Sequence, residues 1–190
     1  MGRQPKHRDA ILSAAIMLFR ERGYSATGVA DILSASGAPK GSLYHYFPGG
    51  KEAVAAASVR LAGEVVTATL VQLAQQSDSG GEFLRAYTAL LGLWLEQSDF
   101  RQGCPIATTL LETSPHSPEI TLAGDEALGA WRDVITDVLL RRPETEGNAA
   151  ALSTLCISAI EGALLMARVS QSCEPLGSVC EQLCRLFEHG

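Results

Sequence analysis

The sequence predicts an all-α protein with an N-terminal helix-turn-helix domain of three helices and a C-terminal helical bundle, about nine helices in total. Apolar residues recur at helical spacing along almost the whole chain, and no segment shows the alternation of a convincing strand. A short polar stretch, residues 28–53, also contains a sharp corner between two short helical segments. We expect one domain over residues 1–50 and a second over 51–190, connected by a long helix at about 51–74.

The first predicted helix begins at Asp9 and ends at Gly23, a residue suited to close a helix with a positive φ. We expect its apolar face to pack against the next two helices and fix the angle of the third. That face carries Ile11, Ala15, Leu18 and Phe19, spaced as i, i+4, i+7 and i+8. The basic residues before it, within 1–8, form either a solvated tail or an arm that contacts phosphate or the minor groove.

The second and third helices are predicted to meet at Gly37, where glycine adopts the positive φ that a corner requires. Pro39 stands where the third helix begins, and its missing N–H costs nothing there. A helix of about two turns is not stable alone, so its neighbours must hold it while its polar side chains remain free for a partner. This is the logic of a helix-turn-helix, whose second helix enters the major groove of DNA.

Helical patterns continue through the second half of the chain. They cover 83–97, 106–113, 119–142, 146–172 and 175–189. Within 146–172, small residues allow another helix to approach closely, which fits either a four-helix dimer interface built from the last two helices or packing within one chain. The apolar run 152–169 is interrupted by Glu161 and Arg168, so we interpret it as a buried helix and not as a membrane span.

Charge is divided unevenly along the chain. The net charge is −6, yet residues 1–60 hold eight Lys or Arg against four Asp or Glu, and the remainder holds seven against seventeen. The basic part coincides with the helix-turn-helix, and the acidic remainder would be repelled by phosphate, which orients the basic end toward DNA. The odd number of cysteines, five, and the lack of a secretory signal indicate a reducing, cytoplasmic location.

The residues around the corner resemble the N-terminal signature of the TetR family of transcriptional repressors, over roughly residues 6–54. The stretch SGAPKGSLYHYFPGGKE, together with Gly103-Cys104-Pro105, is similar to the LmrA/YxaF-like branch of that family. Gly28 and Leu33 depart from the family pattern, and Gly28 removes a hydroxyl that could contact phosphate. The resemblance implies a dimer that binds a palindromic DNA operator and is released by a small effector. The signature residues are Gly23, Tyr24, Thr27, Val29, Asp31, Ile32, Gly37, Lys40, Gly41, Leu43, Tyr44, His45, Tyr46, Phe47, Lys51 and Glu52.

Candidate DNA-binding residues lie in and beside the third helix. Lys40 and Tyr44 are assigned to phosphate or base contact, whereas Leu43 and Phe47 face inward, and Tyr46 either packs on the first helix or touches DNA. Thr27 is expected to cap the second helix, where its hydroxyl or the adjacent N–H groups could also bind phosphate. Lys51 resembles the phosphate-binding lysine of the family. The complete set is Thr27, Gly28, Ala38, Pro39, Lys40, Gly41, Ser42, Tyr44, His45 and Lys51.

Candidate ligand-binding residues form an apolar stripe with a few polar groups, which fits either a core or the wall of a cavity for an apolar or aromatic effector. Glu161 is the best polar anchor, because a carboxylate within a small-residue helix needs a partner if it is buried; its alternative is a rim charge or an ion pair. The set is Phe83, Tyr87, Leu91, Trp94, Cys104, Thr108, Glu112, Trp131, Ile135, Cys156, Ile160 and Glu161.

Signatures of enzymes are poor in this sequence. Gly50-Lys51 is followed by Glu and not by Ser or Thr, and no nucleophile elbow or zinc-protease motif is present. Cys180 and Cys184, with His189, could hold a soft metal in principle, but we expect neither a metal site nor a cofactor. Two alternatives remain: a thiol sensor using Cys104, Cys156 or Cys173, and a small-molecule carrier or enzyme built on a helical bundle.

Overall fold

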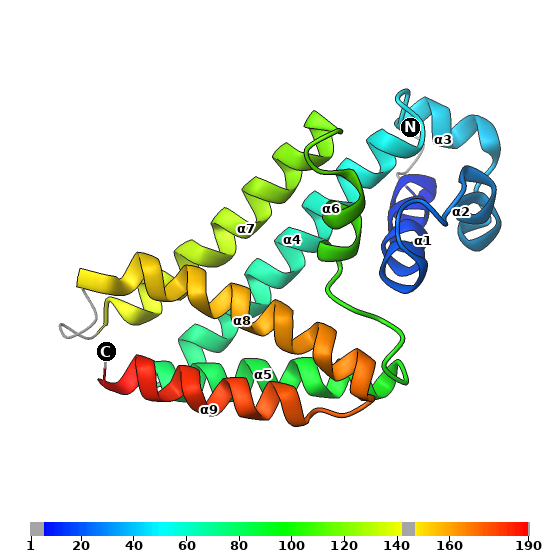
Figure 1. Cartoon of the computed structure of the whole chain (residues 1–190). Helices are drawn as coiled ribbons and strands as arrows, with labels where there is room; N and C mark the ends of the chain where they lie inside the picture. Colours follow the sequence, from blue (N-terminus) through cyan, green and yellow to red (C-terminus); the bar gives the residue numbers. More distant parts are fainter. Residues whose placement is uncertain (1–5, 142–146, 190) are drawn as a thin grey trace. The chain divides into compact units, whose positions relative to one another are not determined.

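The computed structural model describes residues 6–141 and 147–189, and every regular element in those ranges is an α-helix (Figure 1). The all-α prediction is confirmed, and the number of helices in the described ranges equals the predicted number. In chain order they are α1 (Lys6–Arg22), α2 (Val29–Ser36), α3 (Lys40–Tyr46), α4 (Lys51–Gln76), α5 (Gly80–Gln97), α6 (Ala107–Thr113), α7 (Pro118–Leu139), α8 (Ala149–Ser170) and α9 (Glu174–His189).

The ends of the helices differ from the prediction by a few residues. α1 begins at Lys6 instead of Asp9, so part of the predicted basic arm is helical and its first five residues lie outside the described ranges. α7 ends at Leu139, whereas its predicted end at 142 and the predicted start of the next helix at 146 fall outside those ranges. α8 ends where Gln171 adopts a left-handed conformation with a φ of 50°.

The chain forms two compact units that do not follow its linear order. The first, here called the head unit, comprises Met1–Glu64 and Pro105–Ala127; the second, the body unit, comprises Val65–Cys104 and Leu128–Gly190. α4 and α7 each contribute residues to both units. The predicted functional boundary at residue 50 stays a prediction.

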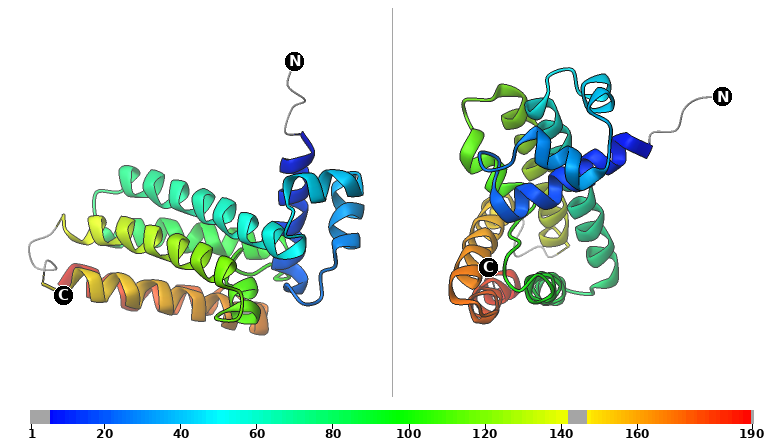
Figure 2. Two further views of the ribbon diagram at one scale, coloured as in Figure 1. Left: turned by 90° about the horizontal axis from the view of Figure 1, so that it is seen from above. Right: turned by 90° about the vertical axis from the view of Figure 1, so that its right-hand side faces the viewer.

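α1 organises the head unit and packs against α2, α3 and α6. Figure 2 shows α1 crossing beside α2 and α3 in both views. Gly37 makes the corner between α2 and α3 with a φ of 63°, and Gly23 ends α1 with a φ of 82°, as predicted. The buried side chains are those expected from the apolar spacing: Ile11, Ala15, Leu18, Phe19, Ile32, Leu43 and Phe47.

The predicted capping role of Thr27 is wrong. The N-cap of α2 is Gly28, whose backbone N–H donates to the Asp31 carboxylate over 2.7 Å. The Thr27 side chain is buried, and its hydroxyl donates back to the Gly23 carbonyl over 2.8 Å. Asp31 therefore supplies the half of a capping box in which a side chain of the first turn accepts from the N-cap N–H, whereas Gly28 has no hydroxyl to supply the other half.

In the body unit, α9 packs against both α5 and α8, and α5 also contacts α8. The core between them is mainly apolar, with Thr88 and Ser153 as buried polar members among the described residues. Its buried side chains include Phe83, Leu84, Leu95, Cys156, Ile160, Ala163, Leu176, Leu183 and Phe187. Two of the sequence candidates for a ligand wall, Trp131 and Ile135, are buried in the same unit on α7.

α4 and α8 are each long and apolar enough to cross a membrane when judged by length and composition alone. Half of the most apolar window of α4 is buried inside the protein, but only one third of that of α8. The prediction of a buried helix at 152–169 thus holds for one face of α8 only. Its other face exposes Leu155, Leu165, Met166 and Val169. An exposed apolar patch of this kind is typical of a surface that binds a partner.

Candidate DNA interface and effector site

α3 has one inward face and one face available to a partner. Leu43 and Phe47 are buried as predicted, which fixes the rotation of the short helix on α1. Lys40, Tyr44 and His45 consequently point away from the core, and Tyr44 remains 45% exposed. A cation, a phenol and an imidazole on one exposed face match the donors that contact phosphates and base edges.

Other DNA candidates surround this face with differing accessibility. Pro39 caps α3 with extended backbone and is exposed together with Gly41. Ser42 is half-buried, whereas Ala38 is buried and can offer only its backbone. Tyr46 is half-buried, and its ring lies edge-on to that of His45 at 5.0 Å. Each role in DNA binding stays a prediction.

Lys51 is held in place by the loop that follows α1. Its ammonium donates a hydrogen bond to the Tyr24 carbonyl over 3.2 Å and lies 4.0 Å from the centre of the Tyr24 ring. These two contacts use one of three donor protons, so the others remain available for a phosphate. A lysine that is already ordered loses less side-chain entropy when it binds DNA.

At the N-terminus of α2, the carboxylate of Asp31 would compete with a DNA phosphate for the backbone N–H groups. The Asp31 carboxylate accepts from the Gly28 N–H, and the Thr27 hydroxyl is used within the loop. A phosphate contact there would have to rely on N–H groups beside the carboxylate. Thr27 and Gly28 therefore have less to offer a phosphate than the sequence alone indicated.

Two residues predicted to bind ligand, Thr108 and Glu112, connect α6 to α1 and the loop after it. The Thr108 hydroxyl donates to the Phe19 carbonyl over 3.1 Å, and the Glu112 carboxylate accepts from the Ser25 N–H over 2.6 Å. A side chain at Gly23 would overlap that carboxylate. These contacts assign α6 a place in the head unit, and the ligand-binding role of both residues stays a prediction.

The pKa of Glu112 is lowered by this arrangement. Burial raises the pKa, but hydrogen bonds from Ser25 and Tyr24 and the charge of Lys51 lower it by more. The carboxylate form is therefore the one that holds α6 on the loop. Acid should loosen this contact, because protonation weakens the hydrogen bonds that the carboxylate accepts.

Four residues from three segments of the body unit come together, among them the half-buried carboxyl of Glu161. They are Tyr87 on α5, Cys104 in the connector after α5, and Cys156 and Glu161 on α8. Burial raises the pKa of Tyr87 well above its ordinary value, and the charges of Cys104, Glu161 and Cys156 raise it further. The group supplies a phenol, two thiols and a carboxyl in otherwise apolar surroundings, which is the composition of a small-molecule site.

Glu161 is the polar centre of this group, here called the Glu161 cluster. Burial raises its pKa, and a hydrogen bond from the Cys104 thiol opposes that shift. A carboxyl whose charged form is disfavoured by burial gains from any ligand that donates a hydrogen bond or carries a positive charge. Glu161 could be predicted from its place in an apolar helix, whereas the approach of Cys104 depends on how the connector folds back.

The remaining apolar candidates line the body core. Phe83, Leu91 and Ile160 are buried, Trp94 is half-buried, and the Phe83 and Tyr87 rings stack at 6.4 Å. Their positions fit either reading of the stripe, a packed core or a wall that opens for a ligand. Their binding role stays a prediction.

Arg168 fastens the connector between α5 and α6. Its guanidinium donates to the Phe100 carbonyl over 3.4 Å and to the Arg101 carbonyl over 3.0 Å. Gly103 allows this close approach, since a Cβ there would lie 2.8 Å from the guanidinium. Asp99 and Phe100 both adopt left-handed backbone with φ values of 53° and 55°, so the connector has a defined and strained path.

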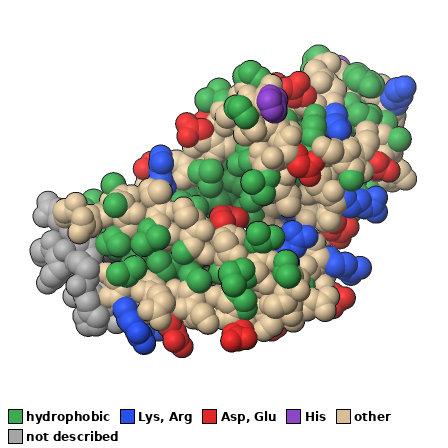
Figure 3. Space-filling model, in the orientation of Figure 1, with side chains coloured by type: hydrophobic (Ala, Val, Ile, Leu, Met, Phe, Trp, Pro, Cys, Tyr) green, Lys and Arg blue, Asp and Glu red, His purple; other side chains and the backbone are tan. Residues whose placement is uncertain are grey.

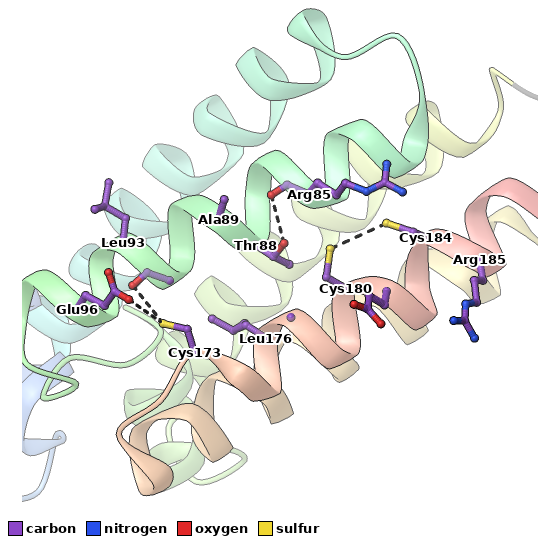
Figure 4. Close-up of a pocket in the computed structure, with 13 residues that line it drawn as sticks. Arg85, Thr88, Ala89, Leu93, Glu96, Cys173, Leu176, Cys180, Cys184 and Arg185 are labelled. Atoms are coloured by element: carbon purple, nitrogen blue, oxygen red, sulfur yellow. Dashed lines mark hydrogen bonds between the residues drawn. The ribbon is translucent and has the colours of Figure 1, made fainter.

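An open groove of about 790 Å³ between α5 and α9 was not predicted from the sequence. Figure 4 shows that its two walls come from these helices, with Leu93 and Cys173 at one end and Cys184 and Arg185 toward the other. Small residues on the facing helices, such as Ala89 and Gly177, are the sequence signal that could have indicated it. The groove is separate from the Glu161 cluster in its lining residues.

Two of the three thiols considered for a redox sensor, Cys156 and Cys173, have raised pKa values. Burial raises the pKa of Cys156 to about 12, with further contributions from Cys180 and Cys184, and the side chain is fully buried. Burial also raises the pKa of Cys173, as does its neighbour Glu96. Because the thiolate is the nucleophile, both residues favour the unreactive form.

The side chain of His189, considered with Cys180 and Cys184 as a possible metal ligand, lies outside the described part of the chain.

Comparison with known proteins agrees with this arrangement. The family model described as bacterial regulatory proteins of the tetR family matches residues 11–58, and the model described as transcriptional regulator LmrA/YxaF-like, C-terminal domain, matches residues 81–182. An uncharacterised HTH-type transcriptional regulator of Mycobacterium tuberculosis is 36% identical over 185 residues, which cover 95% of this chain and 93% of the relative. The HTH-type transcriptional regulator LmrA of Bacillus subtilis is 33% identical over 169 residues, covering 89% and 90%.

Solved structures share the fold over nearly the whole chain. A regulatory protein TetR from Rhodobacter sphaeroides superposes with a TM-score of 0.83 at 25% identity, covering 94% of this chain and 97% of that one. The reduced form of Escherichia coli NemR gives a TM-score of 0.80 at 24% identity, covering 93% and 95%. With both family models and two relatives above 30% identity, the chain belongs to the TetR family of DNA-binding, ligand-responsive transcriptional repressors, in its LmrA/YxaF-like branch.

Proposed function

We propose that this chain is a cytoplasmic repressor that binds a palindromic operator as a homodimer and leaves it when a small apolar or aromatic effector enters the body unit. Each protomer would place α3 in a major groove, and two-fold symmetry would require half-sites about 34–36 Å apart or a multiple of this distance. The proposed activity is binding alone, with no catalytic step, no cofactor and no membrane partner.

The observation that carries the effector proposal is the Glu161 cluster and its position along the chain. Cys104, which donates to Glu161, is followed directly by Pro105 and then by α6. α6 in turn holds the loop after α1 through Glu112 and α1 itself through Thr108. A ligand that displaces Cys104 from Glu161 would pull on the segment leading to α6, and so reorient the reading helix.

The exposed face of α8 supports the dimer. Val169 is 79% exposed, and Leu165 and Met166 are 61% exposed, on the face not used to pack against α9. Figure 3 shows hydrophobic side chains gathered on the molecule where α8 and its neighbours lie. Small residues at Ser158 and Gly162 continue the same exposed face, so a second α8 could approach closely. We propose that α8 and α9 of two chains form a four-helix interface.

The first test is selection of bound sequences from a random duplex pool at two salt concentrations. Recovery of a palindrome with two half-sites supports the regulator and supplies a probe for effectors that release it. Salt-labile binding without sequence preference, persisting after refolding to empty the body unit, would overturn the operator proposal and favour the carrier or enzyme alternative.

Lys51→Ala should weaken binding to operator and to random duplex alike. Loss of one phosphate contact reduces the slope of log affinity against log salt concentration by roughly 0.9. Fluorescence anisotropy on both duplexes across a salt series measures it. An unchanged slope would mean that Lys51 serves only to hold Tyr24.

Glu112→Ala should weaken the coupling between effector and operator, and effector binding to the operator-free variant tests separately whether Glu112 contacts the ligand. Typical coupling of about 5–150-fold between operator affinities with and without effector should fall toward unity, because α6 loses its hydrogen bond to Ser25. Leu111→Ala is the matched control, since this neighbour is 84% exposed on the same helix. Equal coupling in the two variants would contradict the role of Glu112.

A further inference from the structure

Two cysteines that the proposed function does not use lie side by side on the wall of the groove between α5 and α9. Cys180 and Cys184 are one turn apart on α9, and both line the groove. Figure 4 shows both sulfur atoms on the side of α9 that faces α5. The side chains are 7% and 3% exposed, so their sulfurs border the open space without being fully solvated.

The separation of the two sulfurs suits a shared metal ion. Sγ of Cys180 and Sγ of Cys184 are 3.9 Å apart. With metal–sulfur bonds of about 2.3 Å, that separation corresponds to a sulfur–metal–sulfur angle of roughly 116°, between the tetrahedral and trigonal values. The two sulfurs are thus already close enough to chelate one ion, and the Cys184 thiol would lose the proton that it donates to the Gly81 carbonyl over 3.5 Å. Thiolates select soft and borderline metals over hard ones.

Charge favours a divalent ion. Two thiolates and one divalent cation form a neutral unit, so the nearly buried site would carry no net charge, and a large desolvation cost is avoided. Among the described residues no three His, Cys, Asp or Glu side chains converge on one point. The chain thus supplies two ligands, and the groove of about 790 Å³ has room for solvent or a small thiol to supply the others.

We propose that Cys180 and Cys184 form a binding site for one thiophilic divalent metal ion of the zinc, cadmium and mercury class. On binding, the two S–H bonds break, two protons pass to solvent, and two sulfur–metal bonds form without a change of oxidation state. The remaining positions face the groove and take water or a small thiol. This site is independent of the effector site proposed at Glu161.

The test uses the reduced full-length protein and Cd²⁺ as the probe. We expect one Cd²⁺ per chain, an ultraviolet sulfur-to-cadmium charge-transfer band, and release of two protons measured in a weakly buffered solution. Cys180→Ser and Cys184→Ser should each abolish the band and weaken binding by more than the roughly 10–100-fold that loss of an outer-shell partner causes. Cys173→Ser changes a residue at the other end of the same groove, so this variant should keep both the charge-transfer band and the wild-type affinity for Cd²⁺.

A measurement on the unmodified chain guards against variants that fail to fold. Bound Cd²⁺ should slow the alkylation of Cys180 and Cys184, followed by peptide mass spectrometry, while Cys173 reacts at its original rate. Protection of neither residue, or a band that survives in folded Cys180→Ser, would overturn the proposal. Loss of the band in Cys156→Ser with a normal circular dichroism spectrum would overturn the assignment of two protein ligands.

Discussion

The double variant Leu165→Glu/Val169→Glu should be a folded monomer that has lost tight binding to a full palindrome. Both residues lie on the exposed apolar face of α8, and Val169 is 79% exposed, so charge there does not disturb the core of one chain. In the proposed dimer the same carboxylates would be buried without partners. Because two linked heads gain about 10²–10⁴-fold over a single head, affinity for the palindrome should fall by a factor in that range.

Light scattering and anisotropy on full and half operators measure this effect. The variant should bind a half-site as the wild type does, since α3 is not altered. Leu111→Glu is the control, because Leu111 is an exposed leucine, at 84%, on α6 of the head unit. A double variant that stays dimeric would show that the dimer interface lies on another surface. The exposed apolar face of α8 would then have to bind a different partner.

Most of the fold could be predicted because local signals agree along this chain. Gly23 and Gly37 stop helices at positive φ, and the apolar spacing that predicts Leu43 and Phe47 to face inward also fixes which side of α3 is exposed. Helix ends were less well predicted, since capping depends on small differences between competing donors and acceptors. The Thr27 hydroxyl, for example, donates to the Gly23 carbonyl instead of capping α2, and Asp31 accepts from the N–H of the actual N-cap, Gly28.

Only part of each candidate site could be predicted. The sequence shows which residue types are unusual for their surroundings, but it does not show which residues they contact in the fold. Glu161 could be identified as an unusual carboxyl within an apolar helix, whereas Cys104 reaches it only through the path of the connector that Arg168 fastens. Thr108 and Glu112 carry polar groups on an apolar segment, and nothing in their spacing indicated that they hold α1 and the loop after it. The groove between α5 and α9 arises from contacts between segments distant in sequence.

Glu161→Gln should make the protein more stable at neutral pH and less sensitive to its effector. The pKa of Glu161 is raised in the folded state by burial, against a weaker opposing hydrogen bond from Cys104. The folded form therefore holds the proton more tightly than the unfolded form, and wild-type stability falls as pH rises from the unfolded pKa, about 4.3, through the folded one. Glutamine has no proton to lose and avoids this decline.

Urea unfolding at pH 4, 6 and 8 measures the difference in unfolding free energy between variant and wild type, which should be smallest at pH 4 and largest at pH 8.

Operator release by an effector found in a screen measures the loss of effector sensitivity. If the effector donates a hydrogen bond or a charge to Glu161, its half-maximal concentration should rise by about 10–100-fold, the equivalent of roughly 1.5–3 kcal/mol. A variant that gains stability but keeps full sensitivity would place the effector away from Glu161. A variant whose stability follows the same pH curve as the wild type would show that another group causes the decline, because titration of Glu161 then makes no difference to folding.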